Sequence, residues 1–287
     1  MRRMLALVLL GSALLASSAR ADFLYEDFSS TTGLQLNGNA TTGVVAPATG
    51  TALRLTPGGT FQAGSAFTTA MVPLNNQASF STYFQFQMPN AGGLADADGP
   101  GADGIVFVVQ TVSNSVGSSG GGIGYQGIPH SLGVEIDTFD NNLPADQNGN
   151  HVGVDVNGNI DSLAQVPEPT RFNNGQIWNM WVDYNGSSKM LDINWSLSTT
   201  RPAVPQIAFS LAPQGGLVGL LGQSSAFVGF TAATGAGFAD QDILNWQFRQ
   251  DFSPISTVPE PGTLTLAGLG MASLFGWHWR RRKPTAA

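Results

Sequence analysis

The 287-residue chain contains no cysteine. This absence excludes disulfide bonds, cysteine-ligated zinc sites and cysteine nucleophiles. Charged residues are also scarce, at 11% of the chain against a usual share of roughly 25%. Apolar residues make up 42%, and 36 residues are glycine. This composition excludes a disordered polyelectrolyte and a protein with many membrane spans, and it favours one sizeable β-rich core.

The first 21 residues have the features of a secretory signal peptide. Arg2 and Arg3 precede an apolar stretch at residues 4–15, and Ala19-Arg20-Ala21 fits a small-x-small cleavage site. The alternative is a membrane anchor, for which this stretch is short. We therefore expect an N-terminal signal helix within residues 1–21 and an exported mature protein.

Three features follow one another at the C-terminus. Val258-Pro259-Glu260-Pro261-Gly262 precedes an uncharged run over residues 263–279, and a basic cluster at residues 280–283 comes last. The run is at the short end for a membrane-spanning helix, and a basic cluster remains on the cytoplasmic side. Val166-Pro167-Glu168-Pro169 repeats the first motif, but no apolar run follows it.

The order of motif, apolar run and basic tail resembles the PEP-CTERM sorting signal of Gram-negative bacteria that make exopolysaccharide. The resemblance implies processing by an exosortase after a transient inner-membrane anchor. It also implies a final place at the cell surface, the outer membrane or the extracellular matrix. A simple C-terminal anchor is the alternative. The expected divisions are a body at 22–252, a linker with the motif at 253–262, and a single membrane-spanning helix with its tail at 263–287.

Positive charge is nearly absent from the exported body. Between residues 22 and 262, which include the linker, five basic residues stand against all 19 acidic residues. A surface this negative repels nucleic acids and anionic lipids, and it suits neutral ligands and divalent cations. We therefore expect no nucleic-acid partner.

The pattern of the body predicts an all-β fold. Alternating or continuously apolar segments indicate strands, with no helical periodicity between the two ends, at residues 79–88, 104–110, 132–139, 151–157, 177–184, 190–197, 227–234 and 243–250. Asn185-Gly186 predicts a hairpin turn, after which Leu191, Ile193, Trp195 and Leu197 share a face. The expected architecture is an antiparallel β-sandwich. Whether it pairs through a flat sheet into a homodimer stays open.

The segment 135–151 concentrates metal-binding side chains. Glu135 and Asp137 are two residues apart on a predicted strand and therefore point to one face. Asn141, Asp146 and His151 follow in the loop and at the next strand. Carboxylates held this close repel one another unless a cation lies between them. Oxygen ligands suit calcium and a carboxylate–imidazole set suits a transition ion, whereas a solvated acidic loop is the alternative.

The spacing of this segment resembles the metal loop of the legume-lectin (L-type lectin) family. That family places Glu, Asp, an aromatic residue, Asn, Asp and His at offsets 0, 2, 4, 6, 11 and 16, which here are Glu135, Asp137, Phe139, Asn141, Asp146 and His151. The resemblance implies a concanavalin-like jelly roll. It also implies that Glu135, Asp137, Asp146 and His151 hold Mn²⁺ or another divalent transition ion. Asp137, the Phe139 carbonyl, Asn141 and Asp146 would hold Ca²⁺.

The same resemblance implies a sugar site. Ala102-Asp103-Gly104 matches the family motif in which the Asp follows a cis peptide and accepts hydrogen bonds from sugar hydroxyls. Gly121 and Gly122 match the loop that donates a backbone N–H, and Asn141 would donate its amide. Ala236 and Gly237 lie in the variable specificity loop, where Phe238 is the only large side chain nearby, and Phe139 is a candidate stacking ring. The expected partners are glycans or exopolysaccharide, bound without catalysis.

Two other functions remain open. Glu135-Ile136-Asp137 followed by Asp140 is similar to the Glu-x-Asp-x-x-Glu motif of laminarinase-like glycoside hydrolases, which share the sandwich fold. Such an enzyme would work without a metal and would have no role for His151. The third interpretation is a structural matrix protein without a defined ligand.

Overall fold

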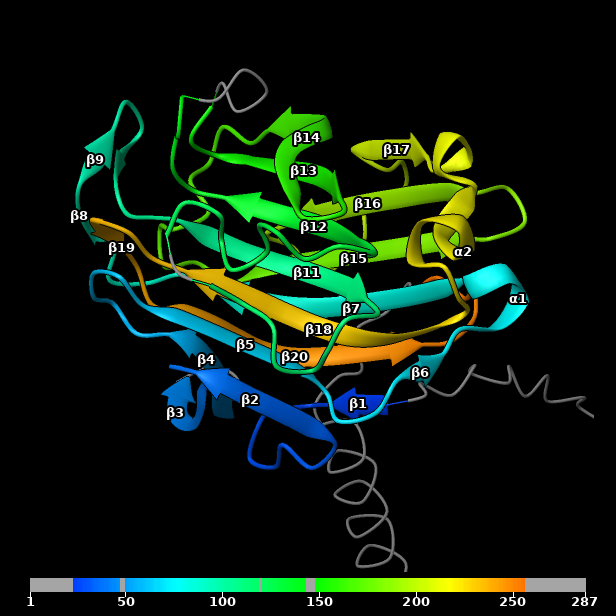
Figure 1. Ribbon diagram of the computed structural model, residues 1–287. Coiled ribbons are helices and arrows are strands. Elements are labelled where there is room, and N and C mark those ends of the chain that lie inside the picture. The colour runs from blue at the N-terminus through cyan, green and yellow to red at the C-terminus, as the bar shows by residue number, and fades with distance from the viewer. Residues whose placement is uncertain (1–22, 47–49, 119, 143–147, 256–287) are drawn as a thin grey trace, which may run out of the picture.

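The computed structural model describes residues 23–46, 50–118, 120–142 and 148–255, and these form an antiparallel β-sandwich (Figure 1). The back sheet runs in the order β17-β16-β15-β7-β20-β4-β3, and β1 pairs with β20. Its strands are β17 (Ile207–Ser210), β16 (Met190–Ser196), β15 (Trp178–Asn185), β7 (Phe80–Gln87), β20 (Gln241–Arg249), β4 (Gly50–Thr56), β3 (Thr41–Ala46) and β1 (Phe23–Tyr25).

The front sheet lies face to face with the back sheet. Its order is β14-β13-β12-β11-β18-β5-β2, and β6 pairs with β18. The strands are β14 (Asn159–Pro167), β13 (His151–Val156), β12 (Ser131–Asp137), β11 (Gly104–Gln110), β18 (Ser225–Ala233), β5 (Ala63–Thr68), β2 (Leu34–Gly38) and β6 (Val72–Pro73). The predicted all-β class and antiparallel sandwich are therefore confirmed.

Short elements decorate the two ends of the sandwich. At one end lie the strand pairs β8 (Gly92–Gly93) with β19 (Gly237–Phe238) and β9 (Ala95–Asp96) with β10 (Gly99–Pro100), on the left in Figure 1. At the other end lie the helices α1 (Asn75–Ala78) and α2 (Gly216–Leu221), the second preceded by a 3-10 turn, Ala212–Gln214. We call the first of these the loop end.

Aromatic side chains fill the space between the sheets. The inward face of β7 carries Phe80, Phe84 and Phe86, each fully buried, as the predicted alternation requires. Phe84 and Phe230 meet edge to face with ring centroids 4.9 Å apart, and Phe230 meets Trp246 in the same way at 4.8 Å. Such ring pairs stabilise beyond their buried area. A core of this kind needs no disulfide.

Three local expectations were wrong. The chain has a helix, α2, between its ends, and this two-turn element, bounded by left-handed Gly215 and Gly222, is too short to create a clear period. β14 was not predicted because it is an edge strand with mostly half-exposed residues. Leu197 does not continue the buried face of its hairpin, since β16 ends at Ser196 and Leu197 is 42% exposed.

The two ends of the chain lie largely outside the described residues. This applies to the predicted signal helix, to the C-terminal Pro-Glu-Pro motif at residues 259–261, to the apolar run and to the basic tail. Within the described ranges, no helix combines the length and apolar character needed to cross a membrane. Residues 253–255 lie on the outer face of the back sheet, where Ser253 N donates to Ser81 Oγ and Ile255 packs with Tyr83 and Trp181.

Candidate functional site

Asp103 lies at the loop end, directly before β11 and next to the ends of β12 and β18 (Figure 1). Its backbone N donates to the Ala233 carbonyl at 3.0 Å, and its carbonyl accepts from Thr138 N at 3.1 Å. The Ala102–Asp103 peptide is cis, as the resemblance implies. The side chain is 3% exposed, and its Oδ2 has no hydrogen-bond partner among the described residues. The backbone therefore fixes a buried acceptor that is still available.

Burial changes the acidity of this carboxyl group. Loss of solvation raises the pKa of Asp103 to about 7 from its ordinary 3.8. Without a cation or a donor nearby, the folded protein therefore keeps this proton at pH values where the unfolded chain has lost it. The shift is caused by desolvation, and no hydrogen-bond donor among the described residues reaches Oδ2 to offset it.

This shift predicts the pH dependence of stability in the chelated protein. Because the folded-state pKa of Asp103 is above the unfolded value, its protonation stabilises the fold. This contribution is fully present below pH ~4 and is lost as the pH rises towards 7. The contribution is on the order of 1–4 kcal/mol. Asp103→Asn mimics the protonated state, so its free energy of unfolding should fall less between pH 4 and 7. Urea unfolding at several pH values in EDTA measures this. Parallel pH profiles for the two proteins would contradict the assignment.

Two of the other predicted sugar-binding positions, Gly121 and Gly237, lie close to Asn141 and to the Asp103 motif. A Cβ atom added at Gly121 would lie 2.6 Å from Asn141 Oδ1, so the Asn141 side chain would have to shift to admit it. Gly122 instead faces Gln126. A Cβ added at Gly237 would lie 2.9 Å from Ala102 Cβ, which places the specificity loop beside the Asp103 motif. Ala236, next to it, is exposed.

The first half of the predicted metal loop, residues 135–151, forms a compact turn after β12. Asp137 Oδ1 accepts from Phe139 N at 2.7 Å, and the Phe139 carbonyl accepts from Asn141 Nδ2 at 3.3 Å. The structure thus brings Asp137, the Phe139 carbonyl and Asn141 together. Asp146, the other predicted calcium ligand, lies outside the described residues. Among the described residues, no three acidic or imidazole groups are grouped closely enough to hold a metal ion by themselves.

Glu135 and His151 meet across the β12–β13 pair. Both are 1% exposed, and Glu135 Oε1 lies 3.2 Å from His151 Nε2. His151 Nδ1 lies 2.7 Å from the Asn148 carbonyl, so it must carry the proton when the ring is neutral. Nε2 then presents a lone pair to the carboxylate. A positive charge, either a second proton or a metal ion, is needed between them, and this donor set fits a divalent transition ion.

A second buried acid extends this cluster. Ser162 Oγ on β14 lies 2.5 Å from Glu135 Oε1 and 2.8 Å from Asp155 Oδ1 on β13. Burial and the neighbouring Glu135 raise the pKa of Asp155 well above its ordinary value. A Cβ added at Gly153 would lie 2.4 Å from Glu135 Oε1, so this position requires glycine. The sequence interpretation missed Asp155 and Ser162, although the alternation of β13 places Asp155 on the same face as His151.

The β9–β10 hairpin supports the metal loop from the side. Asp96 Oδ2 accepts from Asp140 N at 2.9 Å, and Asp96 Oδ1 accepts from Asp98 N at 2.9 Å and Gly99 N at 3.2 Å. One carboxylate thus joins the hairpin to the residue before Asn141. Nothing in the sequence pattern had assigned a role to Asp96, because the contact joins two loops.

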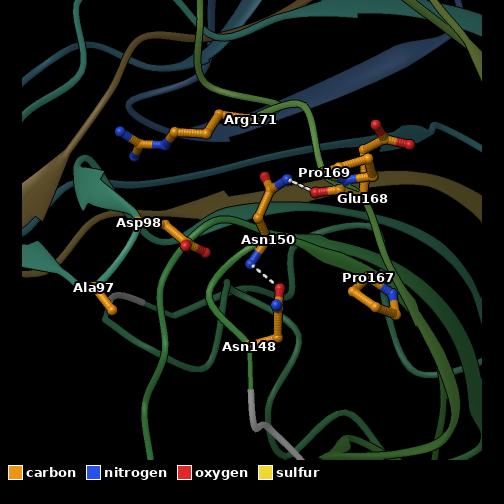
Figure 2. A pocket seen from close by; sticks show the side chains of 8 residues that line it. All are labelled: Ala97, Asp98, Asn148, Asn150, Pro167, Glu168, Pro169 and Arg171. Atoms are coloured by element: carbon orange, nitrogen blue, oxygen red, sulfur yellow. Dashed lines mark hydrogen bonds between the residues drawn. The ribbon is translucent and has the colours of Figure 1, made fainter.

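A pocket of about 450 Å³ lies next to this hairpin and is lined by residues that include Asp98, Asn148 and Arg171 (Figure 2). The internal Pro167-Glu168-Pro169 sequence forms part of its wall. Glu168 is engaged within the protein, since Oε2 accepts from Trp195 Nε1 at 2.9 Å and Oε1 accepts from Thr170 N at 3.0 Å. This copy of the motif is therefore part of the folded sandwich.

Comparisons with known proteins agree with this geometry. The family model of the legume lectin domain matches residues 20–261, and the PEP-CTERM protein-sorting motif matches residues 257–283. A probable L-type lectin-domain containing receptor kinase VII.2 of Arabidopsis thaliana is 31% identical over 263 residues, covering 82% of this chain. The chain spans only 36% of that relative's length.

Solved structures show the same fold. Lectin II from Ulex europaeus superposes with a TM-score of 0.63 at 25% identity, covering 80% of this chain and 98% of the lectin. The basic winged bean lectin, solved with the Tn antigen, gives a TM-score of 0.62 at 27% identity, covering 79% of this chain and 96% of the lectin. By its family match, its sandwich and its loop-end geometry, the chain belongs to the legume lectin family and has a carbohydrate-binding domain of that type.

Proposed function

We propose that this protein is an exported lectin that binds glycans at its loop end, in a manner that depends on divalent cations. One observation carries the proposal: Asp103 presents a buried carboxylate oxygen without a hydrogen-bond partner among the described residues, beside the specificity loop. A buried acceptor of this kind is unfavourable unless a ligand supplies a donor. Adjacent sugar hydroxyls are such donors.

The proposed binding step uses groups that are fixed before the sugar arrives. Asp103 accepts from two neighbouring hydroxyls, Asn141 donates its amide, and the Gly121–Gly122 loop adds a backbone N–H. Because these groups are held in place, little conformational entropy is lost on binding. Affinity for a single sugar should still be weak, on the order of millimolar, so useful binding needs repeated presentation.

In this proposal two cations hold the sugar-binding groups at the loop end in place and take no part in any chemical step. Glu135, Asp137, Asp146 and His151 would hold a transition ion such as Mn²⁺, whereas Asp137, the Phe139 carbonyl, Asn141 and Asp146 would hold Ca²⁺. When bound, the ions supply positive charge that permits the close carboxylates to ionise. The lone pair that His151 directs at Glu135 supports the first of these sites.

The internal contacts of the two acids argue against the glycoside hydrolase. Glu135 contacts His151 and Ser162, and Asp137 Oδ1 accepts from Phe139 N, whereas Asp103 Oδ2 has no such partner among the described residues. A retaining glycosidase must bring both carboxyl groups to the substrate. We therefore assign no catalytic role to either residue.

A glycan array tests the function. The purified full chain should bind a subset of printed neutral glycans with calcium and manganese present, and the matching free sugar should compete. The same glycans incubated with the protein should gain no reducing ends. Release of reducing ends would support the hydrolase instead. Absence of binding to every printed glycan would support the structural matrix protein.

The location remains part of the proposal. The match at residues 257–283 supports recognition by an exosortase and final placement at a bacterial surface or in its exopolysaccharide. The boundaries at residues 21, 252 and 262, the membrane-spanning segment with its basic tail at 263–287 and a homodimer through the back sheet stay predictions. Deleting residues 257–287 and following the protein in cell fractions would test the sorting step, since the truncated protein should no longer stay with the cell surface.

A further inference from the structure

The specificity loop has no large side chain of its own that faces the proposed site. Ala236 is exposed and is flanked by Gly235 and Gly237. The ring of Phe238 lies against the backbone of β8, since a Cβ added at Gly92 would be 2.9 Å from its Cε2 atom. An apolar surface for a sugar must therefore come from another loop.

Phe61, in the connection between β4 and β5, is the prominent aromatic residue beside this loop. Its side chain is 71% exposed, the highest exposed fraction of any aromatic residue among the described large hydrophobic side chains. Its φ of 55° is in the left-handed region, which is rare for a bulky residue. An exposed ring on an unfavourable backbone contributes little to stability, and the Phe61 ring is accessible to a ligand.

Hydrogen bonds hold the Phe61 backbone against the specificity loop. Phe61 N donates to the Gly235 carbonyl at 3.0 Å, and Gln62 N donates to Thr234 Oγ1 at 2.8 Å. Thr234 N in turn donates to the Gln62 carbonyl at 2.9 Å, and Thr234 Oγ1 donates to the Gly59 carbonyl at 2.6 Å. Two connections that are distant in the sequence thus behave as one rim.

Gly235 links Phe61 to the acceptor. A Cβ added at Gly235 would lie 3.4 Å from Asp103 Oδ2, while the carbonyl of the same residue receives the Phe61 amide. Gly235 therefore lies between the Phe61 backbone and the unpartnered carboxylate oxygen. A ligand whose first ring is bound at Asp103 and which extends past Gly235 would come close to Phe61.

We propose that Phe61 is a specificity-determining residue, and that its ring stacks on the apolar C–H face of a second sugar in a neutral oligosaccharide whose first sugar is held by Asp103. This inference rests on the proposed sugar-binding function. A pyranose has polar edges and an apolar face, which suits one exposed ring beside a buried acceptor. The strongly negative body selects against acidic glycans.

The test compares sugars of different length on the full chain. The probes are galactose, N-acetylgalactosamine, fucose, mannose and glucose, each as the monosaccharide and as the end of neutral oligosaccharides of two to five units. With Phe61→Ala, affinity for the oligosaccharide with the strongest array signal should fall roughly fivefold to tenfold, the range expected for one lost ring contact. Affinity for its terminal monosaccharide should stay unchanged. Phe61→Trp should restore oligosaccharide binding.

Matched measurements separate the possible failures. Phe252→Ala removes an aromatic ring that is 40% exposed outside the loop end, and it should change neither affinity. Equal affinities of the wild type and Phe61→Ala for the oligosaccharide would overturn the inference and leave the lectin function standing. Binding to no probe by the wild type would overturn both. A change of oligomeric state in Phe61→Ala, measured by light scattering, would assign the ring to a protein contact and overturn the inference.

Discussion

Asp103→Ala should abolish detectable sugar binding while the sandwich still folds. The carboxylate accepts from two hydroxyls in the proposed complex, and each hydrogen bond to a charged group contributes about 1.5–3 kcal/mol. Loss of both corresponds to at least ~100-fold weaker binding. From a starting affinity on the order of millimolar, this moves the protein out of the measurable range. Binding on a glycan array and by calorimetry would measure the effect.

The controls for Asp103→Ala distinguish the loss of this particular carboxylate from a general loss of negative charge and from a loss of folding. Asp98→Ala removes an exposed acid from the neighbouring hairpin and should bind sugar as the wild type does. Asp103→Asn keeps the shape but replaces one acceptor oxygen with a donor, so it should also bind very weakly. A cooperative thermal unfolding transition in each of the three variants in calcium would show that folding persists. Undiminished binding by Asp103→Ala would favour the structural matrix protein.

Removal of divalent cations should have the second large effect. In EDTA, sugar binding should be lost and the thermal midpoint should fall, because ions that bind only the folded state stabilise it. At a hundredfold excess over the dissociation constant, one ion adds about 2.7 kcal/mol of stability, which is worth several degrees for a domain of this size. Adding calcium and manganese back should restore both properties. Elemental analysis of the purified protein should find both metals.

A pair of variants tests whether the effect comes from the assigned residues. Glu135→Gln removes the charge that faces His151 and should weaken the response to manganese. Asp161→Asn changes an exposed acid on β14 and should leave the response intact. Sugar binding and a thermal midpoint that are the same with and without EDTA would contradict the cation dependence.

The approach of Glu135, Asp137 and His151 could be predicted from sequence because its geometry is local. Glu135 and Asp137 are on one strand, and the register pairs Asp137 with His151 on the next strand of the same sheet. A two-residue period and one hairpin are enough to bring these groups together. The core strands were predicted for the same reason, since their apolar alternation is strong.

The contacts between loops at the loop end could not be predicted in the same way. Asp96 and Phe61 act through hydrogen bonds to loops that are distant in the sequence, and the periodicity of a strand gives no information about such contacts. The edge strand β14 and the short helix α2 were missed because neither buries a full face over several turns or alternations. Sequence patterns report burial well and report the packing of loops poorly.

The direction of β20 has a consequence for how the protein can bind a long polymer. This strand begins beside the specificity loop and runs the length of the sandwich, so that Arg249 pairs with Ser81 at the opposite end (Figure 1). The chain then turns back over the outer face of the back sheet, where Ile255 packs with Tyr83 and Trp181. Ile255, the last described residue, thus lies on the outer face of the back sheet and leaves the loop end uncovered. If the protein is held at a surface as proposed, many such molecules side by side would bind one long polymer at several points along its length.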